Sequence, residues 1–293
     1  EGAVPAEALY KMLQSLTSST LDLHVDGASL IVTGGGSKAK YTLKSEIQLP
    51  FHEIGEADTW QELATPSRLI DALAFARQCC ARSNTDQPAL TCVRLDPERG
   101  LIEATDRLQA SRHYTTLYDG DAALLPQRSV RSLVGYGVDA ICPAPASMHF
   151  RLDEGAGCFS CRVYAAPYPD LDALFQVEGA TIDLSGVDSD ALAGALKRAA
   201  LVLDVEDTRD AEVSITLDGR EMTVEAEGRA GSYRQVLHND ADAGSTITFL
   251  TNPQVFGEIL AHTRTAVLGD NRLKFAGEDW EHVIALRRVE AEE

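Results

Sequence analysis

Five segments of the chain place apolar residues at helical spacing. In the second of them, Leu69, Leu73, Ala76 and Cys80 recur every three or four residues. The segments begin at residues 5, 67, 127, 189 and 252, so successive starts lie 62, 60, 62 and 63 residues apart. Such even spacing indicates an internal repeat. We predict helices over residues 5–16, 67–82, 127–136, 189–203 and 252–266, with N-caps at Ser67, Ser189 and Asn252.

A strand-like segment follows each predicted helix, in which polar and apolar residues alternate and turns interrupt the alternation. The turns of the first four segments centre on Asp26-Gly27, Asp96-Pro97, residues 153–155 and Asp218-Gly219, which are typical hairpin sequences. A short strand-like run also precedes each helix, for example residues 246–250. The pattern predicts an α+β protein built from five repeated β-α-β-β-β units of about 62 residues.

Two stretches between the units are acidic and contain proline. They cover residues 49–62 and 166–177, and they divide the chain into one unit, then two, then two. A single β-α-β-β-β unit buries its sheet poorly, whereas two units can pair with their helices side by side and their sheets outside. We therefore predict domains at residues 1–60, 61–172 and 173–293, the first of them a half-domain.

Composition excludes several classes of protein. With 44% hydrophobic residues the chain is not a disordered acidic tail, and it has no run of about 18 apolar residues that would span a membrane. Six cysteines are too few for a disulfide scaffold, so we read them as free thiols in a cytoplasmic protein. Cys158 and Cys161 match a CxxC pattern, but three positions apart on a strand they face opposite sides, which favours ordinary burial over a metal or redox site.

Four short sequence motifs accompany the repeat. They are Val4-Pro5-Ala6 opening a helix, Ala104-Thr105-Asp106 ending a strand, Tyr168-Pro169-Asp170 in a linker and Arg198-Ala199-Ala200 in a helix. In this order the pattern resembles the bacterial DNA sliding clamp, the β subunit of the replicative DNA polymerase, over nearly the whole chain. That family has three domains of two units each. The resemblance implies that the first half of the first domain is missing, in a chain without an initiator methionine that is either truncated or naturally short.

The resemblance implies a processivity factor: a homodimeric ring that encircles double-stranded DNA without sequence preference and slides along it. The net charge of −19 by itself argues against DNA binding. The charge is, however, distributed unevenly between the predicted helices and the rest of the chain. The five helix windows sum to +5 and the remaining residues to −24, which fits helices lining a ring interior. The expected DNA-facing residues are Lys11, Arg68, Arg77, Arg82, Arg128, Arg131, Lys197, Arg198 and Arg264. The competing interpretation is that Lys and Arg simply favour exposed helix faces.

The resemblance also implies two interaction sites. Partners such as the DNA polymerase and the clamp loader would insert short peptides into an apolar groove lined by Thr105, Arg107, Leu108, Gln109, Ala110, Pro169, Leu174, Val283, Ala285 and Arg287. Here the chain departs from the family, because Arg107-Leu108-Gln109-Ala110 replaces Gly-His-Arg-Leu and because Ala285 and Arg287 replace methionines. The ring would close through Lys38, Lys40, Tyr41, Leu201, Val202, Asp240 and Asp242.

Two other classes of function compete with a DNA clamp. An enzyme could use Asp106 and His113 as an acid–base pair, but the chain shows no phosphate loop, and Gly34-Gly35-Gly36 joins two strand-like runs and therefore predicts a turn. We expect neither enzymatic activity nor a cofactor or metal. The remaining alternative is a clamp-like protein–protein adaptor that does not encircle DNA.

Overall fold

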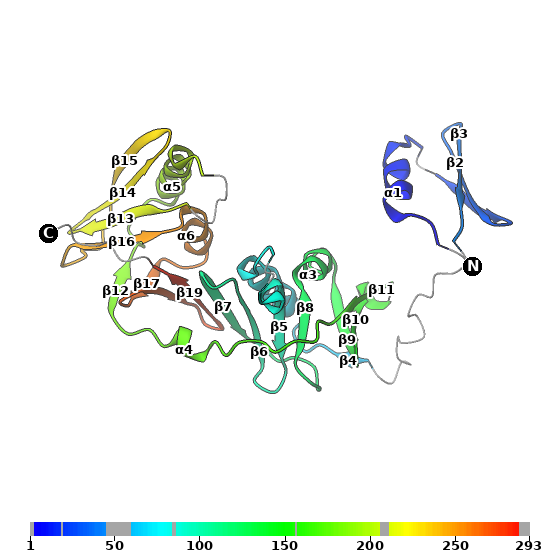
Figure 1. The fold of residues 1–293 in the computed structure, drawn as a ribbon, viewed down its shortest axis with the longest axis horizontal. Helices are drawn as coiled ribbons and strands as arrows, with labels where there is room; N and C mark the ends of the chain where they lie inside the picture. The colour runs from blue at the N-terminus through cyan, green and yellow to red at the C-terminus, as the bar shows by residue number, and fades with distance from the viewer. Residues whose placement is uncertain are drawn as a thin grey trace. The chain divides into compact units, whose positions relative to one another are not determined.

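The computed structural model describes residues 3–18, 20–44, 60–83, 86–155, 157–205 and 211–286 (Figure 1). The chain separates into two units, residues 1–54 and 55–293. In both of them the recurring element is a helix followed by three antiparallel strands.

The first unit holds one helix and a three-stranded meander. α1 (Ala6–Ser15) precedes β1 (Asp22–Asp26), β2 (Ser29–Gly34) and β3 (Ser37–Thr42), which pair in that order. Gly35 and Gly36 have φ values of 58° and 78°, which confirms a turn between two strands at the glycine run. Ile31 and Val32 of β2 are the buried hydrophobic side chains among its described residues, and α1 buries none, so this unit has very little core.

The second unit begins with two helix-and-three-strand segments. The first comprises β4 (Gln61–Glu62), α2 (Pro66–Ala76), β5 (Cys92–Asp96), β6 (Leu101–Thr105) and β7 (Gln109–Tyr114). The other comprises β8 (Ala123–Pro126), α3 (Gln127–Leu133), β9 (Val138–Ala144), β10 (Ser147–Leu152) and β11 (Gly157–Arg162). Short 3-10 helices lie at Arg77–Cys79, Pro88–Thr91 and Asp153–Gly155.

Two further segments complete this unit. After the one-turn helix α4 (Asp172–Phe175) come β12 (Ala180–Asp183), α5 (Ser189–Leu203), β13 (Val213–Asp218), β14 (Glu221–Gly228) and β15 (Gly231–His238). The chain continues through β16 (Ile247–Thr251), α6 (Pro253–Leu260), β17 (Thr265–Leu268), β18 (Arg272–Ala276) and β19 (Trp280–Ala285).

Neighbouring segments exchange their first strands. β4 pairs with β9 while β8 pairs with β5, and β12 pairs with β17 while β16 pairs with β13. Each short strand thus completes the sheet of the other segment in its pair, which ties the two together. The helices of each pair also contact one another, α2 with α3 and α5 with α6.

An eight-stranded sheet, ordered β12-β17-β18-β19-β7-β6-β5-β8, runs across both pairs. It is continuous because β19 pairs antiparallel with β7. Two separate large cores lie against it, one drawn from residues 63–163 and the other mainly from residues 182–286. In Figure 1, α3 and α6 lie on one side of these strands, and the linker with α4 lies on the other.

The predicted helix starts agree with the structure more closely than the predicted ends. Asn252 caps α6, since its Oδ1 accepts the N–H groups of Gln254 and Val255. The caps at Ser67 and Ser189 were wrong: Thr65 precedes α2, and Asp188 caps α5 by accepting the N–H of Ala191 at 2.7 Å.

The helices predicted to reach residues 16, 82, 136 and 266 are too long. They end at Ser15, at Ala76 with a 3-10 turn to Cys79, at Leu133 and at Leu260. Arg82 and Arg264 are therefore not helical.

The cysteines behave as predicted. All six are free thiols, with Cys158 exposed and Cys161 buried on β11, as expected for opposite faces of a strand. Within the described ranges, no helix is both long and apolar enough to cross a membrane, and no cluster of three or more His, Cys, Asp or Glu side chains could hold a metal ion.

Candidate functional site

The seam between β7 and β19 brings together most of the residues predicted to line a peptide groove. Val283 lies opposite Ala110 and Ile284 opposite Gln109 in the antiparallel register. The N–H of Ala285 donates to the carbonyl oxygen of Leu108 at 2.7 Å, so the seam continues into the turn that precedes β7. Pro169 is exposed on the linker, and Arg287 lies outside the described residues.

The floor of this seam is apolar, and the linker packs on it. Leu171 and Phe175 are 1% and 4% exposed and cluster with Ala110 and Val283. Leu174, the linker residue that the sequence singled out, is only partly buried beside them. Sequence reasoning missed Leu171 and Phe175, although their spacing of four residues across α4 is the signal for a shared helix face.

A tight turn over residues 105–109 ends β6 and begins β7. Thr105 Oγ1 donates to the carbonyl oxygen of Gln109 at 2.7 Å, and Asp106 Oδ1 accepts the N–H groups of Leu108 and Gln109, each at 2.9 Å. Asp106 therefore organises a turn. His113 lies four residues along β7 and packs edge-on against Phe75, so the two side chains have separate structural roles rather than those of an acid–base pair.

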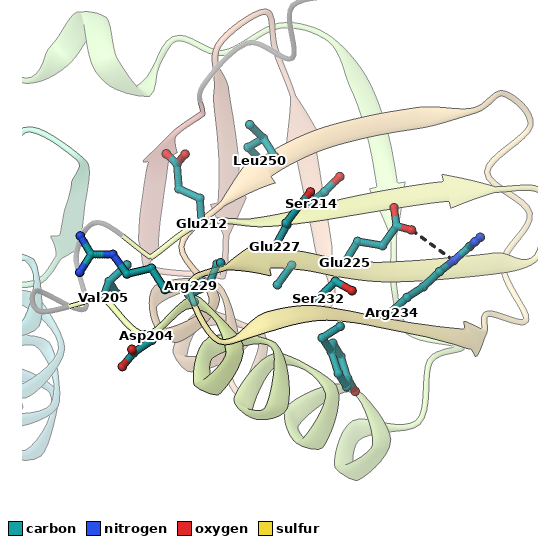
Figure 2. A pocket seen from close by; sticks show the side chains of 14 residues that line it. Asp204, Val205, Glu212, Ser214, Glu225, Glu227, Arg229, Ser232, Arg234 and Leu250 are labelled. Carbon is teal, nitrogen blue, oxygen red and sulfur yellow. Dashed lines mark ion pairs between the residues drawn. The ribbon is translucent and has the colours of Figure 1, made fainter.

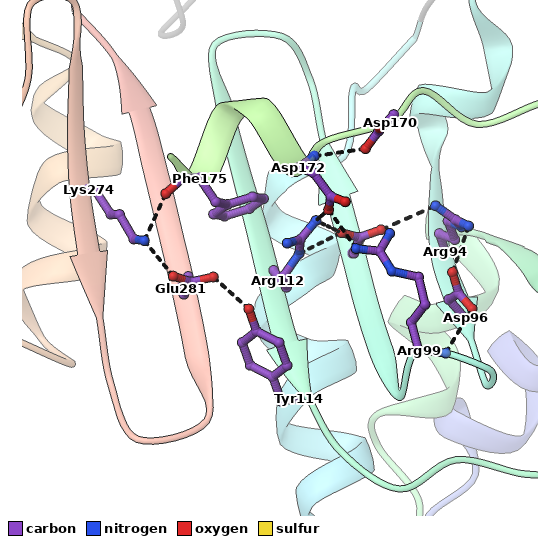
Figure 3. A network of polar contacts seen from close by, with 11 residues as sticks. Arg94, Asp96, Arg99, Arg112, Tyr114, Asp170, Asp172, Phe175, Lys274 and Glu281 are labelled. Carbon is purple, nitrogen blue, oxygen red and sulfur yellow. Dashed lines mark hydrogen bonds and ion pairs between the residues drawn. The ribbon is translucent and has the colours of Figure 1, made fainter. Parts of the chain in front are cut away.

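A polar network holds the linker onto the outer face of β6 and β7. Arg112 Nε donates to Glu103 at 2.7 Å, and its guanidinium also pairs with Asp172, which Arg99 contacts as well (Figure 3). The Arg112 guanidinium lies 4.5 Å from the ring centroid of Phe175. Glu103 is fully buried, and this pairing compensates its charge.

The charges of this network shift each other's pKa values. Hydrogen bonds from Arg99 and then Arg112 lower the pKa of Asp172. Burial by itself would lower the pKa of Arg112, but the charge of Glu103 and the hydrogen bond to Asp172 outweigh it and raise that pKa. Asp172 and Arg112 are therefore both ionised at neutral pH.

A second contact anchors the linker to the other half of the sheet. Lys274 on β18 donates to the carbonyl oxygen of Phe175 at 2.8 Å and pairs with Glu281 on β19 (Figure 3). Tyr114 on β7 donates to the same Glu281 at 2.7 Å across the seam. Linker, β7 and β19 are thus cross-linked by hydrogen bonds on one face.

Eight of the nine predicted DNA-facing cations fall into two groups, and the ninth, Arg77, is half-buried. Four have partners: Lys11 pairs with Glu7, Arg68 with Asp279, Arg198 donates to Tyr233 and Gln235, and Arg264 donates to Ser189. Four others, Arg82, Arg128, Arg131 and Lys197, are exposed and make no ion pair with any described residue.

A cleft of about 500 Å³ lies among the helices of the second unit. Arg77 and Arg82, which follow α2, line it together with Gln127 at the start of α3, the α6 cap Asn252 and Glu258 of α6. It lies where three helices approach one another, and both basic and acidic side chains line it.

The residues predicted to close a ring lie on two edges. Lys38 and Lys40 are exposed on β3 of the first unit, where the Tyr41 hydroxyl donates to the carbonyl oxygen of Ala8. In the second unit Leu201 is 71% exposed on α5, and Val202 accepts a backbone hydrogen bond from Ala230. Asp240 and Asp242 follow β15; Asp240 pairs with His238, and Asp242 accepts the N–H of Gly244.

An open pocket of about 1110 Å³ adjoins the edge strand β15 and the end of α5. Figure 2 shows the side chains of Asp204, Glu212, Glu225 and Glu227 around it. Arg229 and Arg234 also line it, and Arg234 pairs with Glu225 at 3.2 Å. Acidic groups outnumber basic ones, so this edge of the second unit is acidic while β3 of the first unit is basic.

Comparison with known proteins identifies the fold. No family model and no curated protein matches the chain. The structure matches the DNA polymerase β subunit of Streptococcus pyogenes with a TM-score of 0.75 and 20% identity, covering 97% of this chain and 81% of that one. It matches the polymerase III β subunit of Pseudomonas aeruginosa with a TM-score of 0.74 and 16% identity over 98% and 81% of the two chains. It matches the Helicobacter pylori β clamp bound to a DNA ligase peptide with a TM-score of 0.74 and 11% identity, covering 98% of this chain and 82% of that one.

The chain therefore has the α+β fold of bacterial DNA sliding clamps. This confirms the resemblance seen in its sequence motifs at the level of the fold.

Proposed function

We propose that this protein is a replication processivity factor: a cytoplasmic clamp that encircles double-stranded DNA without sequence preference and tethers other proteins to it. The likeness to sliding clamps over 97% of the chain carries the proposal. Arg128, Arg131 and Lys197 support it, because these helical cations of a chain with net charge −19 make no ion pair with any described residue. Weak, non-specific attraction confined to one face would hold DNA without stopping it from sliding.

In this proposal the chain is five clamp half-domains, with boundaries at residues 60 and 172 as the sequence predicts. The helices would face DNA and the sheets would form the outside of a homodimeric ring. The basic edge with Lys38 and Lys40 would meet the acidic edge near Asp240 of a second copy, with Tyr41, Leu201, Val202 and Asp242 beside them. Opposite charges on the two edges would set their orientation.

Partner proteins would bind at the β7–β19 seam. The Helicobacter pylori clamp that shares this fold is bound to a DNA ligase peptide, which supports a peptide-binding role for the corresponding fold here. We propose that polymerase and clamp-loader peptides bind where Leu108 and Ala285 are exposed, at the end of the apolar floor of Ala110 and Val283 that the linker covers. The small side chains of both alanines predict weak binding.

Retention on closed circular DNA tests the encircling function. The protein should stay on nicked circular plasmid through a wash at high salt and leave after the plasmid is linearised, because a ring is held by topology and not by ion pairs. Reversing Arg128, Arg131 and Lys197 to glutamate should reduce loading by an order of magnitude or more, because each lost contact weakens attraction to phosphates.

Arg162→Glu is the matched control. Arg162 is exposed on β11, a strand and not a helix, so its reversal should leave loading unchanged. Equal retention on circular and linear plasmid would contradict encirclement and favour a clamp-like adaptor that binds only proteins. The partners already made by Arg68, Arg198 and Arg264 are the observation that favours this second function.

A further inference from the structure

Arg107 adopts a backbone conformation that suits glycine. Its φ of 81° lies in the left-handed region, which an L-residue with a Cβ adopts only at a free-energy cost. The turn around it is firmly held: its N–H donates to Thr105 Oγ1 at 3.1 Å, and the two following N–H groups donate to Asp106. Glycine would adopt this backbone without strain, so any benefit of arginine must come from its side chain.

That side chain points to no partner within the described part of the chain. Arg107 is exposed, and its guanidinium makes no hydrogen bond or ion pair to a described residue. The adjacent carboxylate of Asp106 accepts backbone N–H groups and so is already engaged. An unpaired guanidinium is a strong donor for a carboxylate from outside the molecule.

Leu108 supplies an apolar contact directly beside this charge. It is 51% exposed, and its carbonyl oxygen is fixed to the N–H of Ala285 at 2.7 Å. The pair therefore stands at the end of the β7–β19 seam, next to Ala110 and Val283. Held by backbone hydrogen bonds on both sides, it loses little freedom when a ligand binds.

We propose that Arg107 and Leu108 form a selectivity tip, which prefers peptides that carry a carboxylate beside their apolar side chains. The inference rests on the proposed peptide groove and names the chemistry of its ligands. The net charge of −19 repels acidic peptides from most of the surface, so the preference depends on this local, unpaired cation.

Fluorescence anisotropy with three labelled hexapeptides tests the tip. The peptides share two leucines and one phenylalanine and differ at one position, which is aspartate, asparagine or lysine. The wild-type chain should bind the aspartate peptide about two- to fivefold more tightly than the asparagine peptide, the range of an exposed ion pair, and the ratio should fall with salt. The lysine peptide should bind least tightly.

Variants at position 107 separate the effect of the side-chain charge from the effect of the backbone conformation. Arg107→Gln and Arg107→Gly should bring the aspartate and asparagine peptides to equal affinity, while Arg107→Lys should keep part of the preference. Leu108→Asp should weaken all three peptides. Arg162→Gln on β11 is the control and should keep the wild-type ratio. Arg107→Gly should not lower the midpoint of thermal unfolding, because it relieves the strained φ, and this establishes that the variant is folded.

The outcomes distinguish the two proposals. Equal affinity for aspartate and asparagine peptides in the wild-type chain, or a preference that survives in Arg107→Gln, overturns the selectivity tip and leaves the groove standing. Failure of every peptide to bind overturns the groove as well.

Discussion

Two buried histidines are kept neutral by the fold. His113 and His282 are 8% and 2% exposed, and their rings lie 4.9 and 5.6 Å from the ring centroid of Phe75. Burial lowers the pKa of His113 to about 4 and the pKa of His282 to about 3. Asp279 opposes the shift at His113, whereas His262 adds to it at both. Burial likewise raises the pKa of the nearby Cys79 thiol, so this cluster is uncharged at neutral pH.

These histidines predict a loss of stability in mild acid. Below about pH 6.5 the unfolded chain binds protons at both imidazoles while the folded chain does not until its lower pKa values are reached. Stability should therefore fall as the pH drops from about 6.5 toward 4, at up to about 1.4 kcal/mol per pH unit for each histidine.

Urea unfolding at pH 7.5 and 5.5 measures this effect. The variant with His113→Leu and His282→Leu should show a smaller difference between the two pH values than the wild type. His238→Leu is the control, because that imidazole is 66% exposed. An unchanged pH difference in the double variant would contradict the assignment.

At the scale of elements, a buried ion pair within the sheet supports one of the linker's attachments. Glu103 on β6 is fully buried, and Arg112 on β7 is 6% exposed. Arg112 continues from Glu103 to Asp172 on α4, whereas Arg99 reaches only Asp172 at the surface. Both arginines thus pair with Asp172, but only removal of Arg112 takes a partner from the buried carboxylate of Glu103.

Arg112→Met should cost about 3 kcal/mol of unfolding free energy, because it strands the buried charge of Glu103 with only the longer contact from Arg94. Arg99→Met should cost far less, since it leaves no buried charge unpaired. Urea denaturation of both variants makes the comparison. Equal losses would show that the buried pair contributes no more than the surface one.

Helix ends show why the sequence predicts some boundaries and not others. Asn252 marks the start of α6 because its side chain bonds the first free N–H groups, which is local chemistry. At the end of α2 the helical pattern continues through Cys79, Cys80 and Ala81, yet the helix has already tightened to a 3-10 turn. All three are buried, and Ala81 donates its N–H to Leu90, so tertiary packing accounts for their apolar character.

At the scale of the whole molecule, the two units carry edges of opposite charge. β3 in the first unit exposes Lys38 and Lys40, and the pocket beside β15 in the second unit is lined by Asp204, Glu225 and Glu227. Edge strands present unpaired backbone groups that favour pairing with another chain. The two edges therefore fit the homodimer proposed above.

Light scattering should find twice the chain mass of 31.6 kDa at low salt, with dissociation as salt rises. The variant with Lys38→Glu and Lys40→Glu should shift the balance toward monomer by about tenfold in dissociation constant, because like charges would then face each other. Lys197→Glu is the control: it reverses a lysine charge on α5 rather than on β3, and it should leave the mass measured by light scattering unchanged. A dimer indifferent to the β3 reversal would contradict this interface.

The sequence alone placed the helix starts to within one residue and placed the hairpin turns, because apolar periodicity and glycine turns are local. It also placed Ala110 and Val283 in one site, but through a resemblance to a family and not through physics. Only the tertiary structure decided that Leu171 and Phe175 cover that site, that Arg68 and Arg198 already have partners, and that Arg107 is held at φ 81°. Each of these depends on atoms brought together from distant strands, and no pattern of spacing along the chain specifies which distant side chains meet.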